Sequence, residues 1–238
     1  MKPYKNRNIA SQVKQLGFTL VEMSVVLVVI GLIIGAVSIG SDLQRNAVYQ
    51  QISSNFMQSW SQAYQNYFNK TGIVIGDSAS APTLKVDGAN ATPGEICTTD
   101  LHGFMDAAGI TMPAGRSEGH EDAFVYLDSN GNPQETTVCF QNVDWSLPGA
   151  TSGYVVRKRN VMVLKSLTPD LARFLDSQVD GKVDARFGLF REGSLANSTS
   201  SASTNWSIDN RRAYGATTNT NLDESQVAVV TAYFMMNN

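Results

Sequence analysis

One uncharged apolar run near the N-terminus limits what this chain can fold into more than any other feature. The run from Met23 to Ser41 holds 19 residues without a charge, and as an α-helix it is about 29 Å long, close to the hydrocarbon thickness of a bilayer. Four basic residues and no acidic ones precede it within the first 17 residues. Because basic flanks stay in the cytoplasm, the pattern predicts a single-pass membrane protein with an exported C-terminal part.

Glu22 stands at the start of this run, where an acidic side chain in a spanning helix is costly and therefore informative. It closes the sequence GFTLVE (residues 17–22), which follows a basic leader and precedes an aliphatic stretch. This stretch resembles the cleavage and methylation site of type IV prepilins and type II secretion pseudopilins. The resemblance covers residues 14–45, and the rest of the chain matches that family by architecture only.

The resemblance implies how the N-terminus is processed and used. A prepilin peptidase cuts between Gly17 and Phe18 and N-methylates Phe18, and Thr19 and Glu22 are then assembly residues. Glu22 lies one helical turn from the new Phe18 amine, in a first turn where the macrodipole favours an anion. Glu22 of one subunit then pairs with the Phe18 amine of another. The implied partners are the prepilin peptidase, other pilins, an assembly ATPase, a platform protein and the inner membrane.

An ordinary secretory signal is the competing interpretation of the N-terminus, with Ala36-Val37-Ser38 as its small-residue cleavage site. The embedded acid and the helical pattern that continues beyond Ser38 argue against it.

The apolar pattern continues past residue 40 at a spacing of mostly four residues, and no proline interrupts it before Pro82. The first helix-ending glycine after Gly40 is Gly72. These features predict one helix of roughly 80 Å from Phe18 to about Lys70. The predicted division is a leader at 1–17, a transmembrane half at 18–40, an amphipathic half at 41–71 and a periplasmic or extracellular head at 72–238.

The head is predicted to contain both helices and strands. The resemblance implies an α+β, type IV pilin-like fold in which the amphipathic half of the long helix packs on an antiparallel β-sheet. Period-two patterns and an Asn-Gly turn predict a hairpin of 123–127 and 136–140, and Thr168-Pro169-Asp170 predicts a helix start whose helix ends at Gly181. The further predicted elements are a short helix at 101–108, strands within 154–164, at 185–191 and at 227–234, and a polar loop at 194–205.

Two cysteines, Cys97 and Cys139, lie in the exported part. An oxidising compartment favours a disulfide between them, and the alternative is two thiols that do not meet.

The charge of the chain argues against nucleic-acid binding. The formal net charge is −3, and the leader carries four of the 18 basic residues and none of the 21 acidic ones, which leaves −7 after cleavage. Such a charge does not favour non-specific binding to nucleic acid. The local basic patches at 157–159 and at Arg211-Arg212 are explained by strand faces or solvated turns.

No catalytic constellation is recognisable in the sequence. His102 and His120 have no convincing nucleophile beside them, and phosphate-binding, dinucleotide and paired-cysteine metal motifs are absent. Asp176, Asp180 and Asp184 cluster at a predicted helix C-terminus, where anions are disfavoured. Bound calcium would relieve that conflict, and solvated acids with basic neighbours are the simpler explanation, so we expect no cofactor.

We therefore expect a structural subunit, not an enzyme: a minor pilin of a type IV pilus, held in the inner membrane with a cytoplasmic N-terminus and then incorporated into an extracellular filament. The alternative within the class is a minor pseudopilin in a periplasmic pseudopilus of a type II secretion system. The alternative from another class is a membrane-anchored adhesin or DNA-binding module, suggested by the polar loop and Arg211-Arg212.

Overall fold

The structure is a computed structural model that describes residues 19–151, 153–206 and 227–237, without the side chains of 37–39, 41 and 42. The chain divides into two compact units, residues 1–44 and 45–238.

The described part of the first unit is helical, and the helical backbone continues into the second. Helix α1 spans Leu20–Gln51, η1 is a π-helix at Ile52–Met57, and α2 spans Gln58–Thr71. Gly72 ends α2 in the left-handed conformation, with φ 74°, and its N–H donates to the carbonyl of Phe68. The predicted helix end is therefore confirmed.

The π-helical segment η1 was not predicted. In it Gln58 N–H donates to the carbonyl of Ser53, five residues back, which places one extra residue in that turn. A spacing of four residues indicates a helix but does not distinguish an α turn from a single π turn.

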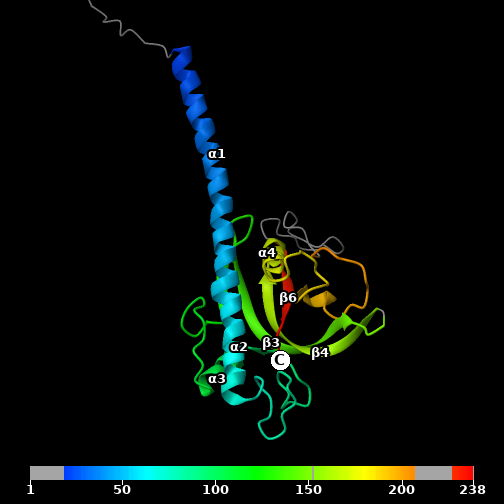
Figure 1. Cartoon of the computed structure of the whole chain (residues 1–238). Helices are drawn as coiled ribbons and strands as arrows, with labels where there is room; N and C mark the ends of the chain where they lie inside the picture. The colour runs from blue at the N-terminus through cyan, green and yellow to red at the C-terminus, as the bar shows by residue number, and fades with distance from the viewer. Residues whose placement is uncertain (1–18, 152, 207–226, 238) are drawn as a thin grey trace, which may run out of the picture. The chain divides into compact units, whose positions relative to one another are not determined.

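The second unit contains an antiparallel sheet with the order β1-β3-β4-β6-β5, and β2 pairs with β3 outside this path. In Figure 1, β3 and β4 form a long curved hairpin. The strand bounds are β1 Ile96–Cys97, β2 Ala123–Leu127, β3 Pro133–Pro148, β4 Tyr154–Leu167, β5 Phe190–Glu192 and β6 Val230–Met235.

The remaining described helices are α3 (Thr98–Ala107), α4 (Pro169–Asp180) and the 3-10 turn η2 (Gly193–Leu195). Helix α4 confirms the predicted start and end: the Thr168 side chain accepts a hydrogen bond from Leu171 N–H, Pro169 is the first helical residue, and Gly181 ends the helix with φ 71°.

The predicted hairpin of 123–127 and 136–140 is confirmed, with β2 and β3 in register from Ala123↔Thr137 to Leu127↔Pro133. The predicted strand at 185–191 is wrong over most of its length, since only residues 190–192 form β5. The N–H of Ala185 donates to Thr204, and the N–H of Leu189 donates to the Asp180 carboxylate. These donors are therefore not available to a neighbouring strand.

Two clusters of buried side chains form the core of the second unit. In the larger cluster the helical stripe packs on the sheet: Tyr64 stacks on Phe140 with ring centroids 4.9 Å apart, and Trp60 lies 6.4 Å from the same ring. The smaller cluster includes Trp145 and Val161. Each fully buried large apolar side chain contributes about 1.5–3 kcal/mol, so the amphipathic half is held by its apolar face. The α+β class is confirmed.

Candidate functional site

Helix α1 begins with reciprocal hydrogen bonds between Thr19 and Glu22. The Thr19 N–H and hydroxyl both donate to Glu22 Oε2 at 2.7 Å, and the Glu22 N–H contacts Thr19 Oγ1 at 3.2 Å. This arrangement is a capping box, which satisfies N–H groups that have no partner inside the helix. Both residues are predicted assembly residues, and the cap was not predicted, although Thr-x-x-Glu before an apolar run is its sequence signature.

The capping box occupies only one oxygen of the Glu22 carboxylate. Both capping bonds end on Oε2, and no described residue donates to Oε1. Both residues are exposed. Glu22 can therefore cap its own helix and accept a hydrogen bond from a cation outside it. Gly17 and Phe18, the predicted cleavage residues, lie outside the described residues.

The described part of the first unit exposes a continuous apolar surface, with Leu20 at 87%, Leu32 at 70% and Leu27 at 69% exposure. Within the described residues, no helix combines the length and the apolarity that crossing a membrane requires. The predicted transmembrane half, 18–40, includes Phe18 and the side chains of 37–39, which the structure does not describe.

Cys97 and Cys139 form a disulfide with their Cα atoms 4.5 Å apart. They are directly opposite each other in the register of β1 and β3, so the bond joins the long loop after α2 to the sheet. The favoured pairing is confirmed. Glu95 lies beside the two sulfur atoms, the one cluster of possible metal ligands in the described part of the chain, but a disulfide uses up both thiols. Glu95 instead forms an ion pair with Lys165.

The three calcium candidates bind backbone and indole N–H groups. Asp176 Oδ2 accepts from the Asp184 N–H at 2.7 Å and from the Trp206 indole at 2.9 Å. Asp180 accepts from the N–H groups of Leu189 and Phe190, both at 3.0 Å from Oδ2. Asp176 and Asp184 are buried, so the interpretation as solvated acids is wrong for these two.

The Asp176 carboxyl group has an unusual protonation equilibrium. Its burial, and then the charge of Asp180, raise its pKa to about 7 against the opposing effect of the two N–H donors. Its Oδ1 is buried and has no hydrogen-bond partner among the described residues. Asp176 is therefore a proton-binding group inside the head that the sequence pattern did not reveal.

The two histidines differ in their surroundings. His102 Nε2 lies 3.0 Å from Asp122 Oδ1 and 3.9 Å from Glu121 Oε2, so its contacts join α3 to the segment before β2. The described contacts of His120 are through its backbone, which bonds to Arg116, Ser117 and Ala123.

The basic patch at 157–159 lies on β4, in agreement with its interpretation as part of a strand. Lys158 forms an ion pair with Asp144 at 3.0 Å. Arg211 and Arg212 lie outside the described residues.

Comparison with known proteins identifies one segment of the chain. Residues 13–38 match the family model described as the prokaryotic N-terminal methylation motif. No curated protein sequence and no solved structure matches the chain significantly. The matched segment contains the capping box and the predicted cleavage site, and the helix that it begins is followed by an antiparallel α+β head. The chain therefore carries a prokaryotic N-terminal methylation motif ahead of an α+β head, which supports the type IV prepilin and pseudopilin family.

Proposed function

We propose that the chain is a minor pilin, a structural subunit that a prepilin peptidase processes and that assembles through its N-terminal helix into a type IV pilus. The observation that carries the proposal is the methylation motif at residues 13–38, in which Glu22 caps α1 with one carboxylate oxygen and leaves the other without a described donor.

Cleavage between Gly17 and Phe18 creates an ammonium group next to the N-cap residue Thr19. Within one chain the approach of this group to Glu22 is cramped. Between chains, the Phe18 ammonium of one subunit binds Glu22 Oε1 of the next and sets their axial register. Methylation keeps the charge of the amine, so it preserves this pairing.

The exposed apolar surface of the first unit supplies the driving force for assembly. Lipid tails are as apolar as the helix, so helices gain little hydrophobic free energy by associating in the inner membrane. Outside the membrane the same surface favours a helical bundle, which shields it from water. Transfer of the helix out of the membrane therefore costs free energy until those contacts form. A separate assembly ATPase and platform protein supply the work, since the sequence contains no nucleotide-binding motif.

The size of the mature chain favours a minor subunit. Cleavage after residue 17 leaves 221 of the 238 residues, which is long for the repeating subunit of a filament. The acidic net charge does not favour a DNA-binding role.

Mass spectrometry of the mature N-terminus and of sheared filaments tests the proposal. We expect a chain that begins with N-methylated Phe18 and that is present in pili at a small fraction of the major subunit. A mature chain that begins at Ile39 identifies a secretory signal and overturns the proposal. A methylated chain that remains in the periplasm with a secretion system identifies a minor pseudopilin instead.

A further inference from the structure

The outer half of the β3–β4 hairpin has one edge that no other strand of the described residues pairs with. We call this half the arm; it consists of residues 142–148 and 154–160, which pair with each other. β6 pairs with β4 only from Val161 to Leu167, and Met236 N–H then donates to the Asn160 carbonyl. No other strand of the described residues pairs with 154–159 on that side.

The direction of the Asn160 carbonyl shows which backbone groups lie on this edge. Successive residues of an antiparallel strand direct their N–H and C=O groups alternately to the two neighbouring strands. Since Asn160 faces β6, the backbone groups of Lys158 and Val156 face the same side. The Lys158 carbonyl accepts from the Arg159 guanidinium at 3.2 Å. Among the described residues, no backbone group pairs with the Lys158 N–H or with either backbone group of Val156.

The opposite edge of the arm is contacted at Ser146. Ser146 of β3 directs its N–H away from β4, and this group donates to the Ala196 carbonyl at 2.8 Å. The Ser146 N–H is therefore not available to a new strand on the β3 side, whereas no described strand pairs with residues 154–159 of β4.

Side chains on the open edge are both apolar and basic. Val155 and Val156 are 43% and 42% exposed, and three basic residues follow them. Lys158 has an acidic partner in Asp144, whereas Arg157 and Arg159 form no ion pair with any other residue that the structure describes. Among the described residues, the positive charge of Arg157 and Arg159 is therefore not balanced by an ion pair, and it lies beside exposed valines.

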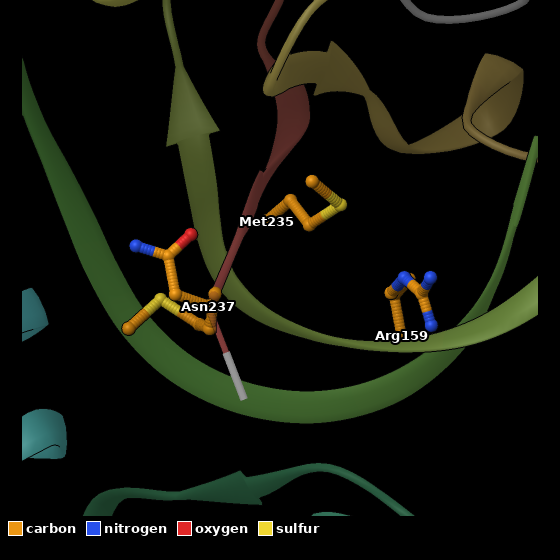
Figure 2. A pocket seen from close by; sticks show the side chains of 4 residues that line it. Arg159, Met235 and Asn237 are labelled. Carbon is orange, nitrogen blue, oxygen red and sulfur yellow. The ribbon is translucent and has the colours of Figure 1, made fainter. Parts of the chain in front are cut away.

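A pocket lies where β6 stops and the open edge begins. It has a volume of about 260 Å³ and is lined by Arg159, Met235, Met236 and Asn237. Figure 2 shows Arg159 and Met235 on the inner side of the curved β3–β4 pair. An apolar side chain can contact the methionines there while an acidic neighbour reaches Arg159.

We propose that the β4 edge from Val155 to Arg159 binds an extended acidic segment of a partner protein, which adds to the sheet antiparallel to β4. Main-chain hydrogen bonds provide the affinity and side-chain contacts the selectivity in this mode of recognition. Two copies of this arm would bring like charges together, which is how basic edge strands avoid self-pairing. A strand with carboxylates at alternate positions gains attraction instead. The inference does not depend on the proposed pilus function.

The test uses the full chain in detergent micelles and a fluorescein-labelled peptide of about ten residues that alternates Val and Glu. The reference peptide replaces each Glu with Lys. We expect saturable binding of the Glu peptide, weaker binding at high salt, and no binding of the Lys peptide. Val156→Pro removes an edge N–H without touching the β3 ladder and should weaken the binding about tenfold, the worth of one lost hydrogen bond.

Val125→Pro is the matched control. Val125 lies on β2, is 43% exposed, and directs its N–H away from β3, since the Ala123 carbonyl two residues earlier faces Arg116. This variant should bind the Glu peptide as the wild type does. Arg157→Glu is a second variant, and it keeps the backbone donors intact. It should no longer bind the Glu peptide and should bind the Lys peptide instead.

Three results would overturn the proposal. The first is that the wild-type chain does not bind the Glu peptide. The second is that Val156→Pro and Val125→Pro lose equal affinity for the Glu peptide. The third is that light scattering shows a dimer of the wild-type chain that Val156→Pro abolishes.

Discussion

The Trp206 indole N–H donates to Asp176 Oδ2 at 2.9 Å, so one buried carboxyl group joins the last turn of α4 to a residue 30 positions later in the chain. The same oxygen accepts from the Asp184 N–H. The stability of this part of the head therefore depends on the protonation state of Asp176.

Asp176→Asn should reduce the pH dependence of stability. The folded chain holds the Asp176 proton up to a pKa of about 7, whereas the unfolded chain releases it near pH 4. Between these values the folded state binds more protons, so the stability from this group is fully present below about pH 4 and is lost as the pH rises to about 7. Asp176 changes the free energy of unfolding by about 1.4 kcal/mol per pH unit at most.

The measurement is urea denaturation of the wild type and of Asp176→Asn at several pH values. Asn can still accept from Trp206 and Asp184, and its amide can donate towards Asp180, so the variant should be the more stable protein at pH 8. Asp176→Ala removes the hydrogen-bond acceptor, so this variant should be less stable than the wild type at every pH. Equal pH slopes for wild type and Asn variant contradict the assignment.

Glu22→Gln separates helix capping from charge pairing. The Gln carbonyl oxygen can still accept from Thr19, so α1 should begin as before and processing should continue, but the neutral side chain cannot balance the ammonium of another subunit. An unpaired buried charge costs about 3–5 kcal/mol, so incorporation into filaments should fall sharply.

Glu22→Ala removes both roles and should also leave processing largely intact. Immunoblots of sheared filaments against whole cells give the readout. Normal incorporation of the Gln variant would show that the charge of Glu22 is not needed.

Replacing both cysteines by serine should destabilise the head. The disulfide closes a loop of sequence separation 42, which stabilises the fold by about 3–4 kcal/mol in the chain-entropy model, and β1 contributes only two paired residues of its own. Thermal denaturation of the Cys97→Ser/Cys139→Ser variant should match that of the reduced wild type. An unchanged Tm would show that the loop is held by other contacts.

Asn160→Ala should loosen the loop that follows α2. Asn160 is buried; its Oδ1 accepts from the Val86 N–H at 3.0 Å, and its Nδ2 donates to the Leu84 carbonyl at 2.9 Å. Leaving these groups without partners should cost about 2–3 kcal/mol. Limited proteolysis should then cut within residues 72–95.

Asn142→Ala is the control for this loop, because Asn142 makes only a side-chain bond to Asn160 Oδ1, at 2.7 Å, and does not contact the loop backbone. Equal protease resistance of the Asn160 variant and the control would refute the role of Asn160.

Removal of divalent cations should leave the Tm of the head unchanged. The carboxylates of Asp176, Asp180 and Asp184 already accept N–H donors, so they do not depend on a metal for charge stabilisation. If EDTA lowers the Tm and added calcium restores it, the result would support a calcium site at this end of α4.

Local rules made several elements predictable from the sequence. The basic leader, the apolar run and the GFTLVE sequence indicate the family, because charge, length and spacing act within a few residues. The end of the long helix at Gly72, both ends of α4 and the β2–β3 turn follow from the same short-range capping and turn preferences.

Contacts between groups far apart in the chain depend on tertiary packing. The sequence pattern at 185–191 indicated a strand. In the structure, the Ala185 N–H donates to the Thr204 carbonyl and the Leu189 N–H donates to the Asp180 carboxylate. Asp176 acquires its raised pKa from burial and from the charge of Asp180. Since β6 ends at Met235, no other described strand pairs with residues 154–159 of β4. These features depend on partners far away in the chain, whose positions are set by packing and not by local sequence.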